Sequence, residues 1–303
     1  MLIDPYGRPI QSIRVSLTRR CNFRCFYCHR EGEPHQRGAE MTPEEIQKII
    51  SIAASFGVKR VKLTGGEPLL RNDILDVIYR IRSVHGIKDI SMTTNGTLLA
   101  EYAKKLKEAG LDRVNVSLDS LNPEKFRQIT CSDALDSVIS GIKEAVKASL
   151  CPVKVNMVLL KDLNEYEVTE MIDFTKKNGL ILQIIELESS NEDEIFQKYH
   201  VSLKRIEECL KSKADKVSVR RMHHRRKYYL HGGGEVEIVK PMHNREFCKY
   251  CNRIRITSDG KLKPCLFRND NLIDLLSPMR RGASEEFLRS LFLEAVKMRK
   301  PYF

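Results

Sequence analysis

Six of the nine cysteines fall into two groups of three, and this pattern is the most informative feature of the sequence. The first group is Cys21, Cys25 and Cys28, with three and then two residues between them. Three thiolates at this spacing can bind one face of a [4Fe–4S] cluster, which needs four ligands. One iron would then be left for a ligand that the protein does not supply. A zinc site is the alternative, with His29 or His35 as the fourth ligand.

The second group lies near the other end of the chain and consists of Cys248, Cys251 and Cys265. Zinc, with His243 as the fourth ligand, is again the alternative to an iron–sulfur cluster. Arg253 and Arg255 alternate directly after Cys251, so on a strand they share one face. Two adjacent guanidinium groups suit a polyanion such as a triphosphate. Taken alone, the pair is equally consistent with a solvated strand face.

The remaining cysteines lack the spacing of ligands, and we expect buried, inert side chains at Cys131, Cys151 and Cys209. The polar segment from Met1 to Pro9 shows no secretory signal, and an odd number of cysteines argues against a disulfide framework. A reducing, cytoplasmic setting is therefore expected. No stretch approaches the roughly 20 apolar residues that a membrane span requires.

The net charge of +12 would attract anions such as nucleotide phosphates or nucleic acid, although a solvated surface explains it as well. The densest basic run extends from Arg220 to Lys227. It could contact nucleic acid or guide phosphates into a site. The favoured interpretation of this run is an exposed hairpin or loop.

The elements that position these residues alternate between strand and helix over the first two-thirds of the chain. Six strands are predicted, at 13–17, 58–64, 87–94, 113–118, 153–160 and 180–188, with helices between them. This alternation predicts an α/β fold with a parallel sheet that is either open or curled into a partial barrel, and we take it to be a partial (β/α)6 TIM-like barrel. Chemistry in such a barrel gathers at the C-terminal ends of the strands. The first cysteine group, Gly65–Pro68, Thr93–Asn95 and Ser117–Asp119 all follow strand ends.

The pattern changes after about residue 190, where short strands near 236–239 and 254–257 replace the regular alternation. We therefore predict two domains, a barrel at 1–190 and a smaller C-terminal α+β domain at 191–303 that carries the second cysteine group.

Two motifs together resemble the radical S-adenosylmethionine superfamily. The first is Cys-x3-Cys-x2-Cys with Tyr27 before the last cysteine, and the second is Gly65-Gly66-Glu67-Pro68. The resemblance implies a [4Fe–4S] cluster whose open iron is chelated by S-adenosylmethionine, and cleavage of that cofactor to a 5′-deoxyadenosyl radical. It assigns S-adenosylmethionine contacts to Tyr27, Gly66 and Ser117. No catalytic side chain beyond the cofactor ligands is expected.

The run Cys-x2-Cys-Asn-Arg-Ile-Arg-Ile-Thr with the distant Cys265 is similar to the GTP 3′,8-cyclase family of molybdenum cofactor biosynthesis, from about Ile10 to Leu276. The resemblance implies a second [4Fe–4S] cluster at which guanine binds. It also implies removal of the ribose C3′ hydrogen and attack of that carbon on C8, which gives (8S)-3′,8-cyclo-7,8-dihydroguanosine 5′-triphosphate. The family's GTP contacts fall on Arg14, Lys62, Thr93, Lys154, Arg253, Ile254 and Arg255.

The same resemblance implies an electron donor and a downstream cyclic pyranopterin monophosphate synthase as partners, and it is compatible with a homodimer. The chain departs from the family pattern at His29-Arg30, at Ile185–Glu188 and at the final residues, which lack a double glycine. Two other classes stay open. One is a radical enzyme that modifies a peptide, against which the cationic residues argue. The other is a metal-stapled nucleic-acid-binding protein, which leaves the cysteine loop and the glycine pair unexplained.

Overall fold

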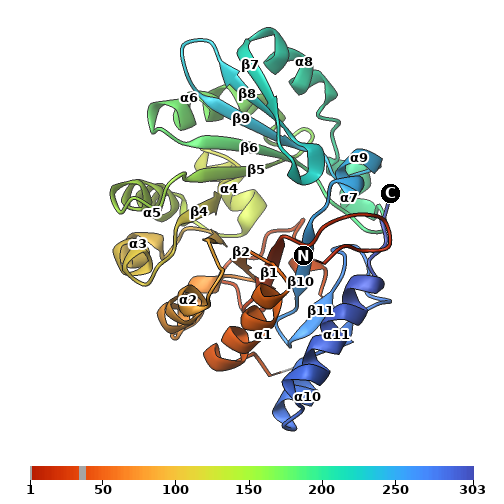
Figure 1. The fold of residues 1–303 in the computed structure, drawn as a ribbon. Helices are drawn as coiled ribbons and strands as arrows, with labels where there is room; N and C mark the ends of the chain where they lie inside the picture. Colours follow the sequence, from red (N-terminus) through yellow and green to blue (C-terminus); the bar gives the residue numbers. More distant parts are fainter. Residues whose placement is uncertain (1, 34–38) are drawn as a thin grey trace.

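A continuous sheet runs through the whole molecule (Figure 1). The computed structural model describes residues 2–33 and 39–303. Within these residues, twelve strands lie in the order β12-β11-β10-β1-β2-β3-β4-β5-β6-β9-β8-β7. The central six strands are parallel and follow chain order: β1 (Ser12–Ser16), β2 (Arg60–Thr64), β3 (Asp89–Thr94), β4 (Arg113–Ser117), β5 (Lys154–Leu159) and β6 (Ile181–Glu186). The predicted partial barrel is confirmed.

Helices cover the outer face of these strands in Figure 1. They are α1 (Pro43–Ser55), α2 (Ile74–Ser83), α3 (Leu99–Glu108), α5 (Leu135–Lys147) and α6 (Val168–Lys177), whereas α4 (Pro123–Thr130) packs against the first cysteine loop at the cavity. Helix α1 starts as the sequence indicates, because Thr42 and Glu45 form a reciprocal capping box. Helix α4 was not predicted, although Asn122 accepts hydrogen bonds from the backbone of Glu124 and Lys125, and Pro123 occupies the first turn. Short 3-10 turns lie at η1 (Arg30–Gly32), η2 (Pro68–Leu70), η3 (Glu165–Glu167) and η4 (Met222–His224).

The residues after 190 extend the same sheet at both of its edges. Strand β9 (Glu235–Val239) pairs with β6, and β10 (Arg253–Ile256) pairs with β1, both in parallel. Antiparallel strands continue outward from these, namely β7 (Ala214–Val219) and β8 (Arg226–Leu230) on one side and β11 (Lys261–Lys263) and β12 (Ile273–Asp274) on the other. The helices of this region are α7 (Glu194–Tyr199), α8 (Lys204–Ser212), α9 (Arg245–Lys249), α10 (Leu276–Arg280) and α11 (Glu285–Lys297). The domain boundary at 190 stays a prediction.

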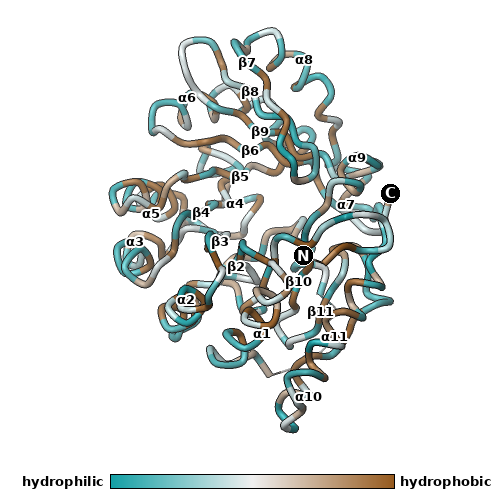
Figure 2. The backbone as a smooth tube through the Cα atoms, in the orientation of Figure 1, coloured by the Kyte–Doolittle hydropathy of each residue, from teal (hydrophilic) through white to brown (hydrophobic). Residues whose placement is uncertain are grey.

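The hydrophobic core lies between the sheet and its helices. The strands carry most of the hydrophobic colour in Figure 2, whereas the helices turn hydrophilic residues outward. Val77 of α2, Val114 of β4 and Val155 of β5 are fully buried in this core. None of the helices in the described residues is long and apolar enough to span a bilayer.

The prediction of three buried, isolated cysteines is wrong. Cys131, Cys151 and Cys209 are all exposed. Cys131 ends α4 in a left-handed conformation, Cys151 lies in the loop before β5, and Cys209 lies on α8. These positions are at turns or on a solvent-facing helix surface, which residue type alone does not reveal.

Candidate functional site

A cavity of about 400 Å³ runs along the inside of the barrel, from the first residues of the strands, such as Arg60 and Asp89, to their C-terminal ends, such as Thr64 and Thr94, and both cysteine groups line it. The lining includes all six motif cysteines, Cys21, Cys25, Cys28, Cys248, Cys251 and Cys265. The two groups are more than 200 residues apart in the sequence, and the pairing of β1 with β10 brings them together. Both groups therefore line one cavity although they are distant in the sequence.

The first cysteine loop follows β1 and is held in place by Gly65 and Gly66. The Gly66 amide donates to the Thr18 carbonyl at 2.7 Å, and the Glu67 amide donates to the Arg20 carbonyl at 2.8 Å. A Cβ on Gly66 would lie 2.2 Å from the Arg20 oxygen, and one on Gly65 would lie 2.4 Å from the Thr18 oxygen. Only glycine allows the two backbones to approach this closely. The turn therefore fixes the segment that leads directly into Cys21.

The surroundings of the first group fit an iron–sulfur cluster. Burial raises the pKa of the thiols of Cys21, Cys25 and Cys28. Neutral thiols are favoured in such a site until a positively charged metal centre takes up the thiolates. In a [4Fe–4S] cluster each thiolate binds its own iron, so the sulfur atoms need not converge on one point.

A single zinc ion fits less well. Among residues 2–33 and 39–303, no three His, Cys, Asp or Glu side chains converge as the ligands of one ion would. His35 lies outside the described residues. His29 faces Glu188 at 3.8 Å, and His243 pairs with Glu192 at 2.6 Å and is not among the residues that line the cavity.

Three residues expected to contact S-adenosylmethionine line the cavity next to the first group: Tyr27, Gly66 and Ser117. The Tyr27 hydroxyl donates to Asp119 at 2.6 Å, and the Val158 amide donates to the same carboxyl at 2.7 Å. Burial raises the pKa of Asp119 to about 6, and the Tyr27 hydrogen bond partly opposes that rise. The ring of Tyr27 is thus fixed in orientation beside Cys28.

The second group lies across the cavity and differs electrostatically from the first. Burial raises the pKa of Cys265. Burial would also raise the pKa of Cys251, but the positive charges of Arg299, Arg253 and Arg8 outweigh it and the pKa is lowered. The thiolate form of Cys251 is therefore favoured by its surroundings.

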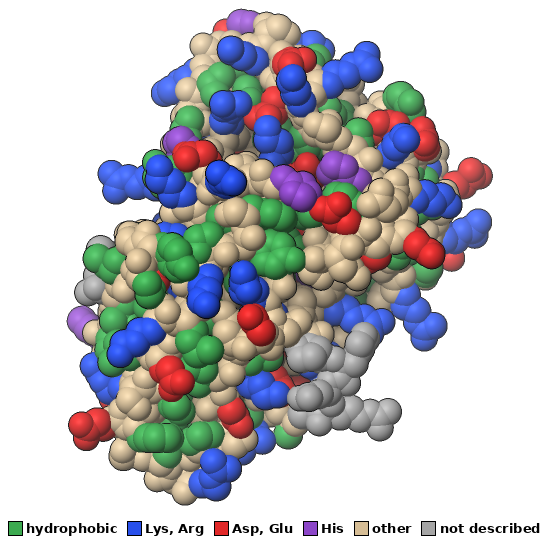
Figure 3. Space-filling view, turned by 90° about the vertical axis from the view of Figure 1, so that its right-hand side faces the viewer, with side chains coloured by type: hydrophobic (Ala, Val, Ile, Leu, Met, Phe, Trp, Pro, Cys, Tyr) green, Lys and Arg blue, Asp and Glu red, His purple; other side chains and the backbone are tan. Residues whose placement is uncertain are grey.

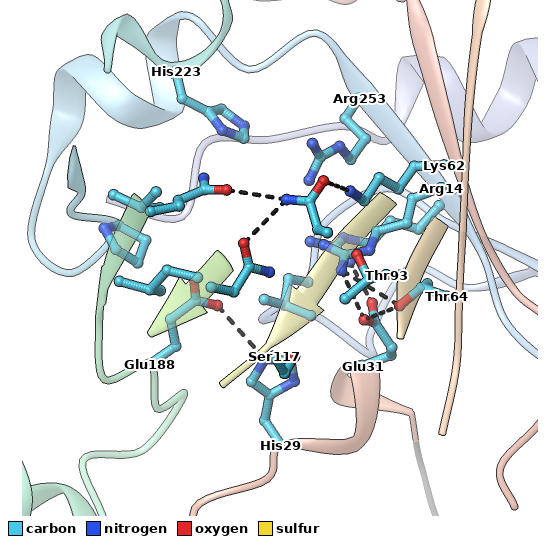
Figure 4. Close-up of a pocket in the computed structure, with 18 of the residues that line it drawn as sticks. Arg14, His29, Glu31, Lys62, Thr64, Thr93, Ser117, Glu188, His223 and Arg253 are labelled. Atoms are coloured by element: carbon cyan, nitrogen blue, oxygen red, sulfur yellow. Dashed lines mark hydrogen bonds and ion pairs between the residues drawn. The ribbon is translucent and has the colours of Figure 1, made fainter. Parts of the chain in front are cut away.

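Cationic residues form one wall of the cavity, and Figure 4 shows Arg14, Lys62 and Arg253 among them. Arg14, Lys62, Thr93, Lys154, Arg253 and Arg255 all line the cavity. Lys62 donates to Asn115 at 2.7 Å, and Asn115 donates in turn to Asn156 and Gln183 on the next two strands. Ile254 differs, because its side chain is fully buried in the core on the other face of β10. The alternation predicted for Arg253 and Arg255 is confirmed.

Two family models together match nearly the whole chain. The Radical SAM superfamily model matches residues 15–175, and the Molybdenum Cofactor Synthesis C model matches residues 180–303. A probable GTP 3′,8-cyclase of Thermococcus kodakarensis is 52% identical over 100% of both chains. One from Methanothermobacter thermautotrophicus is 49% identical over 99% of this chain and 98% of its own. The chain belongs to the GTP 3′,8-cyclase family of radical SAM proteins.

Solved structures of other proteins share the fold. Streptococcus suis SuiB bound to S-adenosylmethionine superimposes with a TM-score of 0.66 at 17% identity, over 87% of this chain and 62% of that chain. This likeness concerns the fold alone. It agrees with the partial barrel of β1 to β6.

A buried carboxylate that the sequence did not reveal lies within the cationic wall of this family member. Glu31 pairs with Arg14 at 3.0 Å and with Arg255 at 2.8 Å, and it accepts a hydrogen bond from Thr64 at 2.8 Å. Burial would raise its pKa, but Arg14 and Arg255 outweigh burial and lower it to about 2. Glu31 thus marks a position between two guanidinium groups that suits an anion. The position of Glu31 shortly after Cys28 in the sequence gave no indication that it would lie between two arginines.

The basic run at 220–227 is only partly exposed, contrary to the favoured interpretation. Arg221 and Arg226 are exposed, whereas Arg220 and Arg225 line the cavity. Arg220 and Arg225 contact the fully buried Glu237 at 3.0 and 3.1 Å, and Lys154 contacts the same carboxylate. Three cations around one carboxylate leave excess positive charge at this end of the cavity.

His223 of η4 lies near Arg253 and points into the cavity in Figure 4. Its ring stacks on Phe247 with the centroids 3.9 Å apart. Burial and the nearby arginines, Arg253 foremost, hold its pKa well below the usual value. A neutral imidazole therefore faces the cavity beside the second cysteine group.

Proposed function

We propose that this protein is a GTP 3′,8-cyclase that acts with two [4Fe–4S] clusters and S-adenosylmethionine. The observation that carries the proposal is the single cavity in which two cysteine trios face each other across a cationic wall. A peptide substrate would not require that wall, whereas a nucleoside triphosphate matches it in charge.

The cysteines would hold the clusters, Cys21, Cys25 and Cys28 the first and Cys248, Cys251 and Cys265 the second. When bound, the first cluster with S-adenosylmethionine supplies a radical that removes hydrogen from C3′ of GTP, so that C3′ can bond to C8 of guanine. Each trio leaves one iron without a protein ligand. The first open position would take S-adenosylmethionine, beside Tyr27, Gly66 and Ser117, and the second would take guanine.

The chain's own residues bind and orient the triphosphate. Lys62, Lys154, Arg253 and Arg255 were expected to do so, and Arg220 and Arg225 add two cations at the same cavity. In a site largely removed from water these charges act more strongly than at the surface. GTP would therefore lie between the two cysteine groups, with its phosphates on the cationic wall.

The outer surface of the molecule bears on the alternative of a nucleic-acid-binding protein. On the face drawn in Figure 3, Lys and Arg side chains are scattered among Asp and Glu. Such mixing is typical of a solvated surface rather than of a nucleic-acid site. We also propose an electron donor and a downstream cyclic pyranopterin monophosphate synthase as partners, and a cytoplasmic location.

The test is an anaerobic assay of the reconstituted and reduced protein with S-adenosylmethionine, with and without GTP. We expect 5′-deoxyadenosine and the cyclised nucleotide to form together. Cys21→Ala should abolish both products, while the exposed Cys209→Ala should leave both unchanged. Cleavage of S-adenosylmethionine without consumption of GTP would contradict the proposal and favour a peptide-modifying enzyme.

Arg220 tests the cationic wall, with its exposed neighbour Arg221 as a matched control. Arg220→Gln should raise the KM for GTP at least tenfold, since a hydrogen bond to a charged group contributes roughly 1.5–3 kcal/mol and about 1.4 kcal/mol is a factor of ten. Arg221→Gln should leave the KM unchanged. Steady-state assays of both variants decide the matter. Equal KM values for the two variants would exclude Arg220 from the site.

A further inference from the structure

A buried ion-pair network lies next to the second cysteine group. It joins Asp4 and Arg8, near the start of the chain, to Arg299, near its end. Asp4, Arg8 and Arg299 are each at most 5% exposed. Asp4 accepts from the Nε of Arg8 at 2.7 Å and from the Nη1 of Arg299 at 2.8 Å. Arg299 follows α11, whose last residue is Lys297. The site and the family assignment leave this network without a function.

Both arginines of the network contact the loop that carries the second cysteines. Arg8 donates to the Cys248 carbonyl at 3.1 Å. Arg299 donates through Nη2 to the Cys251 carbonyl at 2.9 Å and lies 3.5 Å from the Cys251 sulfur. Arg299 is therefore a hydrogen-bond donor to Cys251, one of the three cysteines proposed to hold the second cluster.

The charges of the network do not cancel. Two guanidinium groups share one carboxylate, which leaves one positive charge, and this charge faces Cys251. The Nε of Arg299 is buried and has no hydrogen-bond partner among the described residues. A clamp that only stabilised the loop would not need an excess of charge, and a neutral donor would serve equally well. The excess suits an anionic group on the far side of Cys251.

We propose that Arg299 raises the reduction potential of the second iron–sulfur cluster by donating a charge-assisted N–H···S hydrogen bond to Cys251. Reduction adds a negative charge to a cluster, so positive charge and donors at its sulfur ligands stabilise the reduced form. The inference rests on the proposed function in one respect, the presence of that second cluster. Arg299 acts on the cluster through its ligand and is a positioning and tuning residue rather than a catalytic one.

The experiment is an anaerobic redox titration of the reconstituted holoprotein, followed by electron paramagnetic resonance, for the wild type and Arg299→Gln. We expect the midpoint potential of the second cluster to become more negative in the variant. The ratio of reduced to oxidised cluster at a fixed potential should fall at least tenfold, which is about 59 mV for one electron. The first cluster is an internal control, and its potential should not change.

Two further variants separate tuning from folding. Lys297→Gln removes an exposed charge at the end of α11, two residues before Arg299, and should leave both potentials unchanged. Asp4→Asn removes the carboxylate that partly neutralises Arg299, so it should shift the second potential in the opposite direction, to more positive values. A purely structural role for the network predicts no such opposite pair of shifts. Asp4→Asn also tests the inference if Arg299→Gln does not fold.

Iron and sulfide counts on each sample distinguish a failure of the proposed two-cluster cofactor set from a failure of the inference about Arg299. A wild type that holds one cluster would contradict the proposed cofactor set and the inference with it. A wild type with two clusters, and variants whose second potential equals that of the wild type, would overturn the inference alone. Opposite shifts from Arg299→Gln and Asp4→Asn, with an unchanged first cluster, would establish it.

Discussion

At the scale of single residues, the site is defined by charges that have been removed from water. Lys154 of β5 is an example, since it lines the cavity and contacts Glu237 on the same wall. Burial lowers the pKa of Lys154 to about 8, although Glu237 acts to raise it. A lysine with this pKa changes charge close to neutral pH. The contribution of this one cation to ligand binding can therefore be followed by changing the pH.

Binding of GTP should therefore weaken as the pH rises through about 8. Lys154 is protonated below that pKa and can pair with a phosphate, and it is neutral above it. Lys154→Arg keeps its charge at every pH used, so its affinity should stay constant where that of the wild type falls. Equilibrium binding of GTP between pH 6.5 and 9.5 measures both. Identical profiles for the two proteins would show that another group titrates.

Residue types and spacing were enough to predict most of this wall, but not all of it. Lys62, Arg253 and Arg255 could be placed because motifs and strand alternation fix their direction. Arg220 and Arg225 could not, since a dense basic run is typical of solvent-exposed loops. Their place in the cavity wall depends on the buried Glu237, and a single Glu in a short strand gives no sign that three cations will surround it. Buried charge pairs of this kind become visible only when strands are brought together.

At the scale of elements, one turn positions one loop. The turn after β2 packs its backbone against Thr18 and Arg20, so the first cysteine loop has little freedom to move. The strand β1, the turn and the cysteine loop therefore act as one unit. Correct geometry at Cys21 depends on a residue that binds no iron.

Gly66→Ala should disrupt the first cluster while leaving the second intact. The added Cβ would meet the Arg20 carbonyl at 2.2 Å, and backbone cannot yield as a flexible side chain can. We expect lower iron content and loss of S-adenosylmethionine cleavage, measured by iron assay and product quantification. Gly86→Ala is the comparison, because open space surrounds that position while its left-handed φ of +92° carries a stability cost. If Gly86→Ala lost as much iron, general destabilisation would be the cause.

The existence of these elements was predictable, but the neighbours of two strands were not. Strands β9 and β10 show the expected alternation, and both lie close to their predicted ranges. Their parallel partners, β6 and β1, are distant in sequence, and a parallel pair has no tight turn that would announce it. A separate second sheet was therefore an equally reasonable reading of the pattern. The shared sheet is what places the second cysteine group opposite the first.

At the scale of the whole molecule, the C-terminal region covers both edges of the barrel sheet. Without β9 and β10, the edges of β6 and β1 would expose unpaired backbone groups. The cationic wall of the cavity also depends on the whole molecule, because residues before and after position 190 both contribute to it. Neither region contains a complete site.

A chain that ends at residue 190 should be aggregation-prone, since two long parallel edges and part of the core would be open. Size-exclusion chromatography and circular dichroism of residues 1–190 would test this. Co-expression of residues 191–303 as a separate chain should restore solubility by covering both edges. A monodisperse, folded 1–190 fragment would show instead that the barrel is an independent domain.

The pairing of β1 with β10 also sets the order in which the molecule can be completed. Ser12 and its partner Asn252 are 240 residues apart, so one edge of the barrel waits for most of the chain to be synthesised. At the usual rate of translation this delay is roughly 10 to 50 s. During that interval β1, which leads into the first cysteine loop, has a neighbouring strand on one edge alone. Loading of the first cluster on the ribosome, before the second cysteine group exists, is a route that this topology permits.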